Sequence, residues 1–101
     1  MNRQEDLKTF APAARMLKFM AHPLRLAIIN DLLLERQLSV GQLQKRLNIS
    51  QSMTSQHLSA LKIAGIVACE KKANECHYYI QNRNILKFLE CIRKCVQRHG
   101  A

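Results

Sequence analysis

The chain has 101 residues, 48% of them hydrophobic, and its 16 Lys and Arg outnumber its 7 Asp and Glu, giving a formal net charge of +9. This length predicts one domain, and the hydrophobic content is too high for a disordered chain. Because no apolar run approaches the roughly 20 residues needed to cross a bilayer and the polar start is not a secretion signal, we expect a cytoplasmic protein with reduced thiols. The positive charge favours a polyanionic partner, either nucleic acid or an anionic membrane surface.

Two helices are predicted before residue 35. Apolar residues that include Phe10 and Leu17 recur at helical spacing, which predicts a first helix over about residues 5–20. Pro23 is well suited to the first turn of a second helix, which we expect over residues 24–34. His22 directly precedes this proline, so we interpret it as a helix-entry residue rather than a metal ligand.

Residues 39–64 have the pattern of two short helices joined by a tight turn. Ser39 and Gln42 form a capping box for the first of these helices. Asn48 tolerates the left-handed conformation that such a turn needs, and Ser50 is a suitable N-cap for the second helix. The segment is therefore predicted to be a helix-turn-helix.

The second of these helices has two contrasting faces. Thr54, Leu58 and Leu61 form its predicted buried face, and Gly65 ends it. The opposite face carries short hydroxyl and amide side chains, namely Gln51, Ser52, Ser55, Gln56 and Ser59. Such groups hydrogen bond with base edges in the major groove, whereas an ordinary solvated face would be richer in Glu and Lys. We predict a DNA recognition helix, and leave His57 open between a DNA contact and a structural bond.

A β-hairpin of two short strands is predicted next, over about residues 66–80, around the turn Lys72-Ala73-Asn74-Glu75. Lys71 and Lys72 near its tip, and Lys62 at the end of the recognition helix, are predicted to contact DNA phosphates. The alternative for the hairpin pair is that these lysines only keep an edge strand soluble.

A last helix, over about residues 83–98, has a more apolar face than a peripheral helix needs. A domain of this size buries a modest core and would gain stability from a large dimer interface. We therefore predict a homodimer that pairs through the first and last helices. The residues placed at this interface are Phe10, Leu17, Phe88, Leu89 and Ile92.

The four cysteines form two pairs. Cys91 and Cys95 lie four residues apart on one face of the last helix, with His99 continuing the line, and they are the preferred effector site. Cys69 and Cys76 are diagonal neighbours on one face of the hairpin if residues 72 and 75 flank its turn. Thiolates bind thiophilic metals and metalloids such as Zn, Cu(I) and As(III); the alternative is that these small side chains only pack. No cofactor is expected to be needed for folding.

Several segments carry a resemblance to a known family: Ala21-His22-Pro23-Leu24-Arg25, Leu38-Ser39-Val40-Gly41-Gln42-Leu43, Ser50-Gln51-Ser52, Ser55-Gln56-His57-Leu58, Leu61-Lys62 and Ala64-Gly65-Ile66-Val67. Over about residues 14–96 the chain resembles the winged-helix repressors of the ArsR/SmtB family. The resemblance implies a mainly α (α+β) winged helix-turn-helix of five helices with a two-stranded wing, dimerising through its first and last helices. It also implies repression from a palindromic operator, with DNA contacts at Gln51, Ser52, Ser55 and Gln56.

The sequence departs from this family at the inducer sites. The positions of the thiolate motif of arsenic and cadmium sensors hold Ser39 and Gly41. The positions of the zinc and nickel site in the last helix hold Asn82, Asn84, Cys95 and Arg98. Asn30 stands where persulfide-responsive relatives have a cysteine in the second helix. The inducer is therefore predicted only by class, as a metal, metalloid or thiol-redox signal.

The predicted function is that of a sequence-specific DNA-binding transcriptional regulator without enzymatic activity. Its partners would be double-stranded DNA, a second copy of the chain and a small inducer, with no membrane. The competing hypothesis is a basic winged-helix adaptor that binds protein or an anionic membrane surface. A lipid-binding helix would carry Lys and Arg beside large apolar side chains, whereas this recognition helix carries Ser and Gln.

Overall fold

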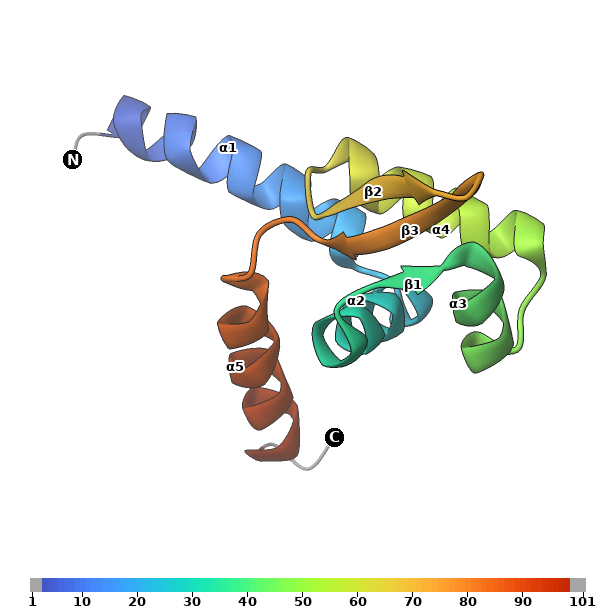
Figure 1. Ribbon diagram of the computed structural model, residues 1–101. Helices are drawn as coiled ribbons and strands as arrows, with labels where there is room; N and C mark the ends of the chain where they lie inside the picture. Colours follow the sequence, from blue (N-terminus) through green and yellow to red (C-terminus); the bar gives the residue numbers. More distant parts are fainter. Residues whose placement is uncertain (1–2, 99–101) are drawn as a thin grey trace.

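The computed structural model describes residues 3–98 and contains, within them, five helices and a three-stranded antiparallel sheet (Figure 1). In chain order the elements are α1 (Arg3–Met20), α2 (Pro23–Glu35), β1 (Leu38–Ser39), α3 (Val40–Leu47), α4 (Gln51–Ile63), β2 (Val67–Lys72), β3 (Glu75–Ile80) and α5 (Ile85–Arg98). This confirms the expected five helices and hairpin wing. Across residues 3–98, none of the helices combines the length and apolar character that a membrane span requires.

The predicted helix starts are confirmed by their hydrogen bonds. His22 caps α2, because its Nδ1 accepts a hydrogen bond from the Leu24 backbone N–H at 3.0 Å. Ser39 and Gln42 form the expected capping box of α3, with Ser39 Oγ accepting from the Gln42 N–H at 3.2 Å. Ser50 Oγ accepts from the Met53 N–H at 3.1 Å and so caps α4.

The turns around α4 use left-handed backbone where the sequence indicated it. Asn48 has φ 54° and ends α3, and Gly65 has φ 75° just after α4. The Ile66 N–H donates to the Leu61 carbonyl at 3.0 Å, which closes the end of the helix. α3 and α4 are therefore held in a fixed helix-turn-helix geometry.

The sheet has one strand that was not expected. Leu38 and Ser39 pair with Tyr78 and His77, so the strand order is β1-β3-β2 rather than a two-stranded hairpin alone. Two residues are too few to show strand periodicity in a sequence, and Ser39 also serves as the cap of α3. The wing is thus hydrogen bonded to the start of the helix-turn-helix.

The hydrophobic core is built by α2, α3, α4 and the sheet. Its fully buried aliphatic side chains are Ile28, Ile29, Leu32, Leu43, Leu58, Leu61, Ile66 and Val67. Burying each of them contributes about 1.5–3 kcal/mol. By contrast, α1 adds only Met20 and α5 only Ile85 to the set of buried residues. The N-terminal part of α1 projects beyond the body of the molecule, and α5 lies along another side (Figure 1).

Candidate nucleic-acid interface

Helix α4, the predicted recognition helix, is divided between a buried and an exposed face. Thr54, Leu58 and Leu61 are fully buried, as expected. Thr54 Oγ1 also donates to the Ser50 carbonyl at 2.8 Å, which satisfies its hydroxyl inside the protein. All five side chains predicted to read bases are exposed on the opposite side, namely Gln51, Ser52, Ser55, Gln56 and Ser59. Their polar tips are therefore available to a ligand that approaches this helix.

His57 has a structural position, which resolves the question that the sequence left open. It is 8% exposed, and its Nδ1 accepts a hydrogen bond from Arg25 Nε at 3.1 Å. Its ring lies 4.6 Å from that of His22, centroid to centroid. Burial lowers the pKa of His57 below its usual 6.5, and the neighbouring His22 and Arg25 lower it further. His57 is therefore neutral near pH 7, with its proton on Nε2.

Arg25 links three helices, a role that no pattern in the sequence predicted. Besides its bond to His57 in α4, its Nη1 donates to the Phe19 carbonyl near the end of α1 at 2.9 Å. Arg25 and His57 are separated by 32 residues. No local spacing relates two residues so far apart, so only the fold could reveal that one arginine fixes α4 against α1 and α2.

The three lysines predicted to contact phosphates are all exposed, but they point in different directions. Val67 and Ile80 pair with each other and are both buried, so their side of the hairpin faces the core. Side chains alternate along a strand, so this inner face of the wing also carries Cys69, Lys71, Cys76 and Tyr78. Lys71 thus lies on the inner face, while Lys72 lies on the outer one.

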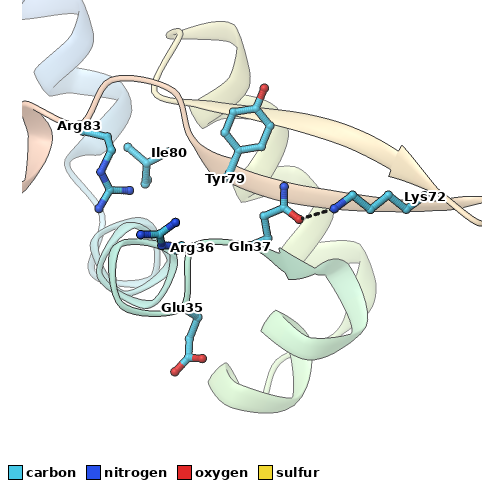
Figure 2. A pocket seen from close by; sticks show the side chains of 7 residues that line it. All are labelled: Glu35, Arg36, Gln37, Lys72, Tyr79, Ile80 and Arg83. Carbon is cyan, nitrogen blue, oxygen red and sulfur yellow. Dashed lines mark hydrogen bonds between the residues drawn. The ribbon is translucent and has the colours of Figure 1, made fainter.

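On that outer face Lys72 forms a hydrogen bond with Gln37 (Figure 2). Its Nζ donates to Gln37 Oε1 at 3.1 Å, and Gln37 Nε2 donates in turn to Glu70 Oε2 at 3.3 Å. The side chain borders an open hollow of about 630 Å³ that Arg36 and Arg83 also line. These hydrogen bonds hold Lys72 against the segment before β1, so it is less free than Lys62 or Lys71 to reach a phosphate.

The residues predicted at the dimer interface leave apolar surface uncovered. Phe10 is 61% exposed, Leu17 46% and Ile92 41%. Leu17 and Phe88 line one groove between α1 and the start of α5. Leu89 and Ile92 line a second groove between α2 and α5. All five predicted residues lie on α1 and α5, each of which buries one residue in the core, and Phe88 and Leu89 are half-buried against that core.

The two cysteine pairs differ in their surroundings. Cys91 and Cys95 are both exposed on α5, and His99, which was expected to extend their line, lies outside the described residues. Cys69 and Cys76 are half-buried and occupy the diagonal positions expected from the hairpin register. Between residues 3 and 98, no three or more His, Cys, Asp or Glu side chains are grouped so that they could hold a metal ion.

Comparisons with known proteins agree with this geometry. Residues 22–68 match the family described as "Bacterial regulatory protein, arsR family". The chain is 39% identical over 94 residues to the transcriptional activator HlyU of Vibrio cholerae, covering 93% of this chain and 86% of that protein. It is 36% identical over 83 residues to the transcriptional repressor PagR of Bacillus anthracis, covering 79% and 83% respectively.

Solved structures match the fold over nearly the whole chain. The structure of reduced HlyU from Vibrio cholerae has a TM-score of 0.81 at 38% identity, covering 91% of this chain and 96% of that one. A homodimeric winged helix-turn-helix DNA-binding domain from Mycobacterium bovis has a TM-score of 0.82 at 23% identity, covering 98% and 93%. The winged helix-turn-helix predicted from the sequence is thereby confirmed.

Proposed function

The chain belongs to the ArsR family of bacterial transcriptional regulators, which bind DNA and are not enzymes. We propose that it is a homodimeric repressor of a palindromic operator. The observation that carries this proposal is the exposed face of α4. Five hydroxyl and amide side chains lie there, while the opposite face of the same helix is locked into the core. Relatives in this family include both an activator and a repressor.

We assign direct base readout to the exposed side chains of α4. Gln51, Ser52, Ser55, Gln56 and Ser59 lie on the side of the helix that would enter the major groove. Gln pairs with the hydrogen-bonding edge of adenine, and Ser both donates and accepts. Burial of Thr54 and His57 beneath this surface holds the helix rigidly, which keeps the reading groups in register with the bases.

Phosphate contacts are assigned to Lys62 and Lys71. Lys62 is exposed in the last turn of α4, and Lys71 extends from the inner face of the wing. Lys72 would have to give up its hydrogen bond to Gln37 before it could contact DNA. The net charge of +9 supplies the long-range attraction to the duplex.

The second copy of the chain is proposed to cover α1 and α5. Phe10, Leu17 and Ile92 are large apolar side chains that stay 41–61% exposed in the single chain. Burial of such side chains in a partner contributes about 25 cal/mol for each Å² of apolar area removed from water. Two copies related by a two-fold axis would present two α4 helices, which is why the operator should be palindromic.

Selection from a random duplex library at near-physiological salt tests this proposal. We expect one enriched palindrome with half-sites about 10 base pairs apart, bound by two copies of the chain. A promoter carrying that site should then lose transcription in vitro when the protein is added. Enrichment of no motif, together with binding to phosphatidylserine vesicles, would instead support the adaptor hypothesis. If binding to the enriched motif raises transcription, the repressor role is refuted, while sequence-specific DNA binding stands.

A further inference from the structure

The two wing cysteines share one face of the hairpin. Cys69 pairs with Tyr78, and Cys76 pairs with Lys71, in the antiparallel register of β2 and β3. The two cysteines are therefore diagonal neighbours, and both are half-buried on the inner face of the wing. Nothing in the DNA-binding role proposed above uses them.

The two thiols lie at neighbouring diagonal positions of the hairpin and interact. The hydrogen bond that Cys69 shares with Cys76, followed by burial, raises the pKa of the Cys69 thiol. Diagonal residues in an antiparallel pair have Cα atoms roughly 7–8 Å apart, which is beyond the roughly 4.4–6.8 Å usual for a disulfide. Two metal–sulfur bonds, each about 2.3 Å long in the case of zinc, let the two sulfur atoms lie up to about 4.6 Å apart. The spacing therefore suits one bridging ion better than a direct bond between the sulfurs.

The number of ligands narrows the choice of ion. A structural zinc site needs four ligands, and across residues 3–98 no metal-ligating cluster reaches three members. The possible ligands next to the cysteines in sequence, namely Glu70, Glu75 and His77, project from the outer face instead, where His77 Nε2 lies 3.7 Å from Glu75 Oε2. Soft thiolates select Cu(I), a monovalent cation that two thiolates satisfy. We propose that Cys69 and Cys76 form a two-coordinate Cu(I) site on the inner face of the wing.

Binding at this site changes the charge beside the DNA surface. One Cu⁺ and two thiols give an anionic bis-thiolate complex and release two protons, with no change of oxidation state. Lys62 and Lys71 already act electrostatically on the Cys69 thiol, lowering its pKa against the larger effects that raise it. The new negative charge would attract the same two lysines that are proposed to hold phosphates. Cu(I) should therefore weaken DNA binding, and DNA should weaken Cu(I) binding by the same factor.

The metal arm of the test uses the full chain, reduced and free of oxygen. A Cys91→Ser, Cys95→Ser variant keeps only the wing pair, and it is titrated with Cu(I) against a chromogenic Cu(I) chelator. We expect one Cu(I) per chain and a thiolate-to-copper absorption band in the near ultraviolet. Adding Cys69→Ser, or Cys69→Ala as a second replacement, should lower the affinity at least tenfold, with unchanged circular dichroism.

Three results would overturn the site. The first is equal Cu(I) affinity with and without the Cys69 thiol, and the second is one Cu(I) for every two chains, which would mean that the ion bridges two copies. The third is a protein isolated in air without reductant in which thiol titration finds neither wing thiol free, because dioxygen has then taken two electrons from the pair to form a disulfide.

The predicted effect of Cu(I) on operator binding rests on the proposed function, so it is measured in a separate experiment from the metal titration. On the selected operator, one equivalent of Cu(I) should weaken binding by the variant with only the wing pair about tenfold, and leave binding by the variant without Cys69 unchanged. If Cu(I) binds at the wing and operator affinity does not change, the coupling is refuted while the metal site stands. If no operator is found at all, the proposed function fails, and the metal titration still decides the site.

Discussion

Replacing Arg25 with methionine tests whether the contact between α1, α2 and α4 stabilises the fold. Methionine keeps an unbranched chain of similar length but removes the guanidinium. The change deletes two hydrogen bonds, one to the Phe19 carbonyl at 2.9 Å and one to His57 Nδ1 at 3.1 Å. It also leaves the buried imidazole nitrogen of His57 without this donor.

The expected cost follows from these two bonds. A hydrogen bond that involves a charged group contributes about 1.5–3 kcal/mol to stability, and both bonds are only partly buried, which favours the lower end. We expect Arg25→Met to lower the free energy of unfolding by roughly 2–4 kcal/mol. Since small domains have about 5–15 kcal/mol in total, the variant should still fold at low temperature.

Urea unfolding followed by far-ultraviolet circular dichroism measures this difference. Parent and variant must be compared at one protein concentration, because dimerisation adds to apparent stability. Lys45→Met is the matched control, since it removes one positive charge from an exposed position on α3 and should change stability by no more than about 0.5 kcal/mol. An Arg25→Met protein as stable as this control would refute the structural role of the contact.

The same contact predicts how stability depends on pH. The folded protein lowers the pKa of His57 below the value of 6.5 that the unfolded chain has. Above pH 6.5 the imidazole is neutral in both states, and its environment imposes no penalty. As the pH falls from 6.5 toward the folded pKa, only the unfolded chain takes up the proton, so stability declines. In Arg25→Met one cause of the lowered pKa is gone, so this decline should be smaller.

Four other substitutions probe separate parts of the molecule. Gln56→Ala should cost roughly 1–3 kcal/mol on the selected operator and relax preference at one base pair; equal loss on scrambled DNA would contradict base readout. Lys71→Ala should weaken binding to all sequences alike and lower the salt slope by about one, as gel shifts over a salt series would show. Ile92→Glu would bury an unpaired carboxylate in the proposed interface, so light scattering should find monomers, and an intact dimer would rule this interface out. Ala73→Gly should stabilise the protein by about 1 kcal/mol, since Ala73 has φ 50°; a lower melting temperature would refute the strain.

The parts of the fold that the sequence predicted are those with local signals. The cap at Ser39, the left-handed turn at Asn48 and the cap at Ser50 each depend on residues at most five positions apart. The two faces of α4 follow from helical periodicity alone, and the structure exposes and buries the residues that this periodicity separated. Local backbone chemistry therefore accounts for the helix-turn-helix.

The parts that the sequence did not predict depend on contacts between distant residues. The strand β1 exists only because β3 pairs with it across 40 positions of the chain, from Leu38 to Tyr78. Lys71 and Lys72 look equivalent in the sequence, yet they project from opposite faces of the hairpin, and only Lys72 meets Gln37. The sequence shows that both lysines are present, but the register of the strands determines which face of the hairpin each side chain projects from.

Arg25 connects the proposed dimer surface to the proposed DNA-binding surface. The surface proposed for a second copy lies on α1 and α5, and the surface proposed for DNA lies on α4. Arg25 spans from the Phe19 carbonyl in α1 to His57 on the buried side of α4, so a displacement of the end of α1 acts directly on the recognition helix. The proposed dimer contact on α1 would therefore set the separation of two α4 helices through Arg25. Since half-site spacing on DNA is set by that separation, Arg25→Met should loosen the spacing preference of the operator as well as the fold, which a series of operators with altered spacers would detect.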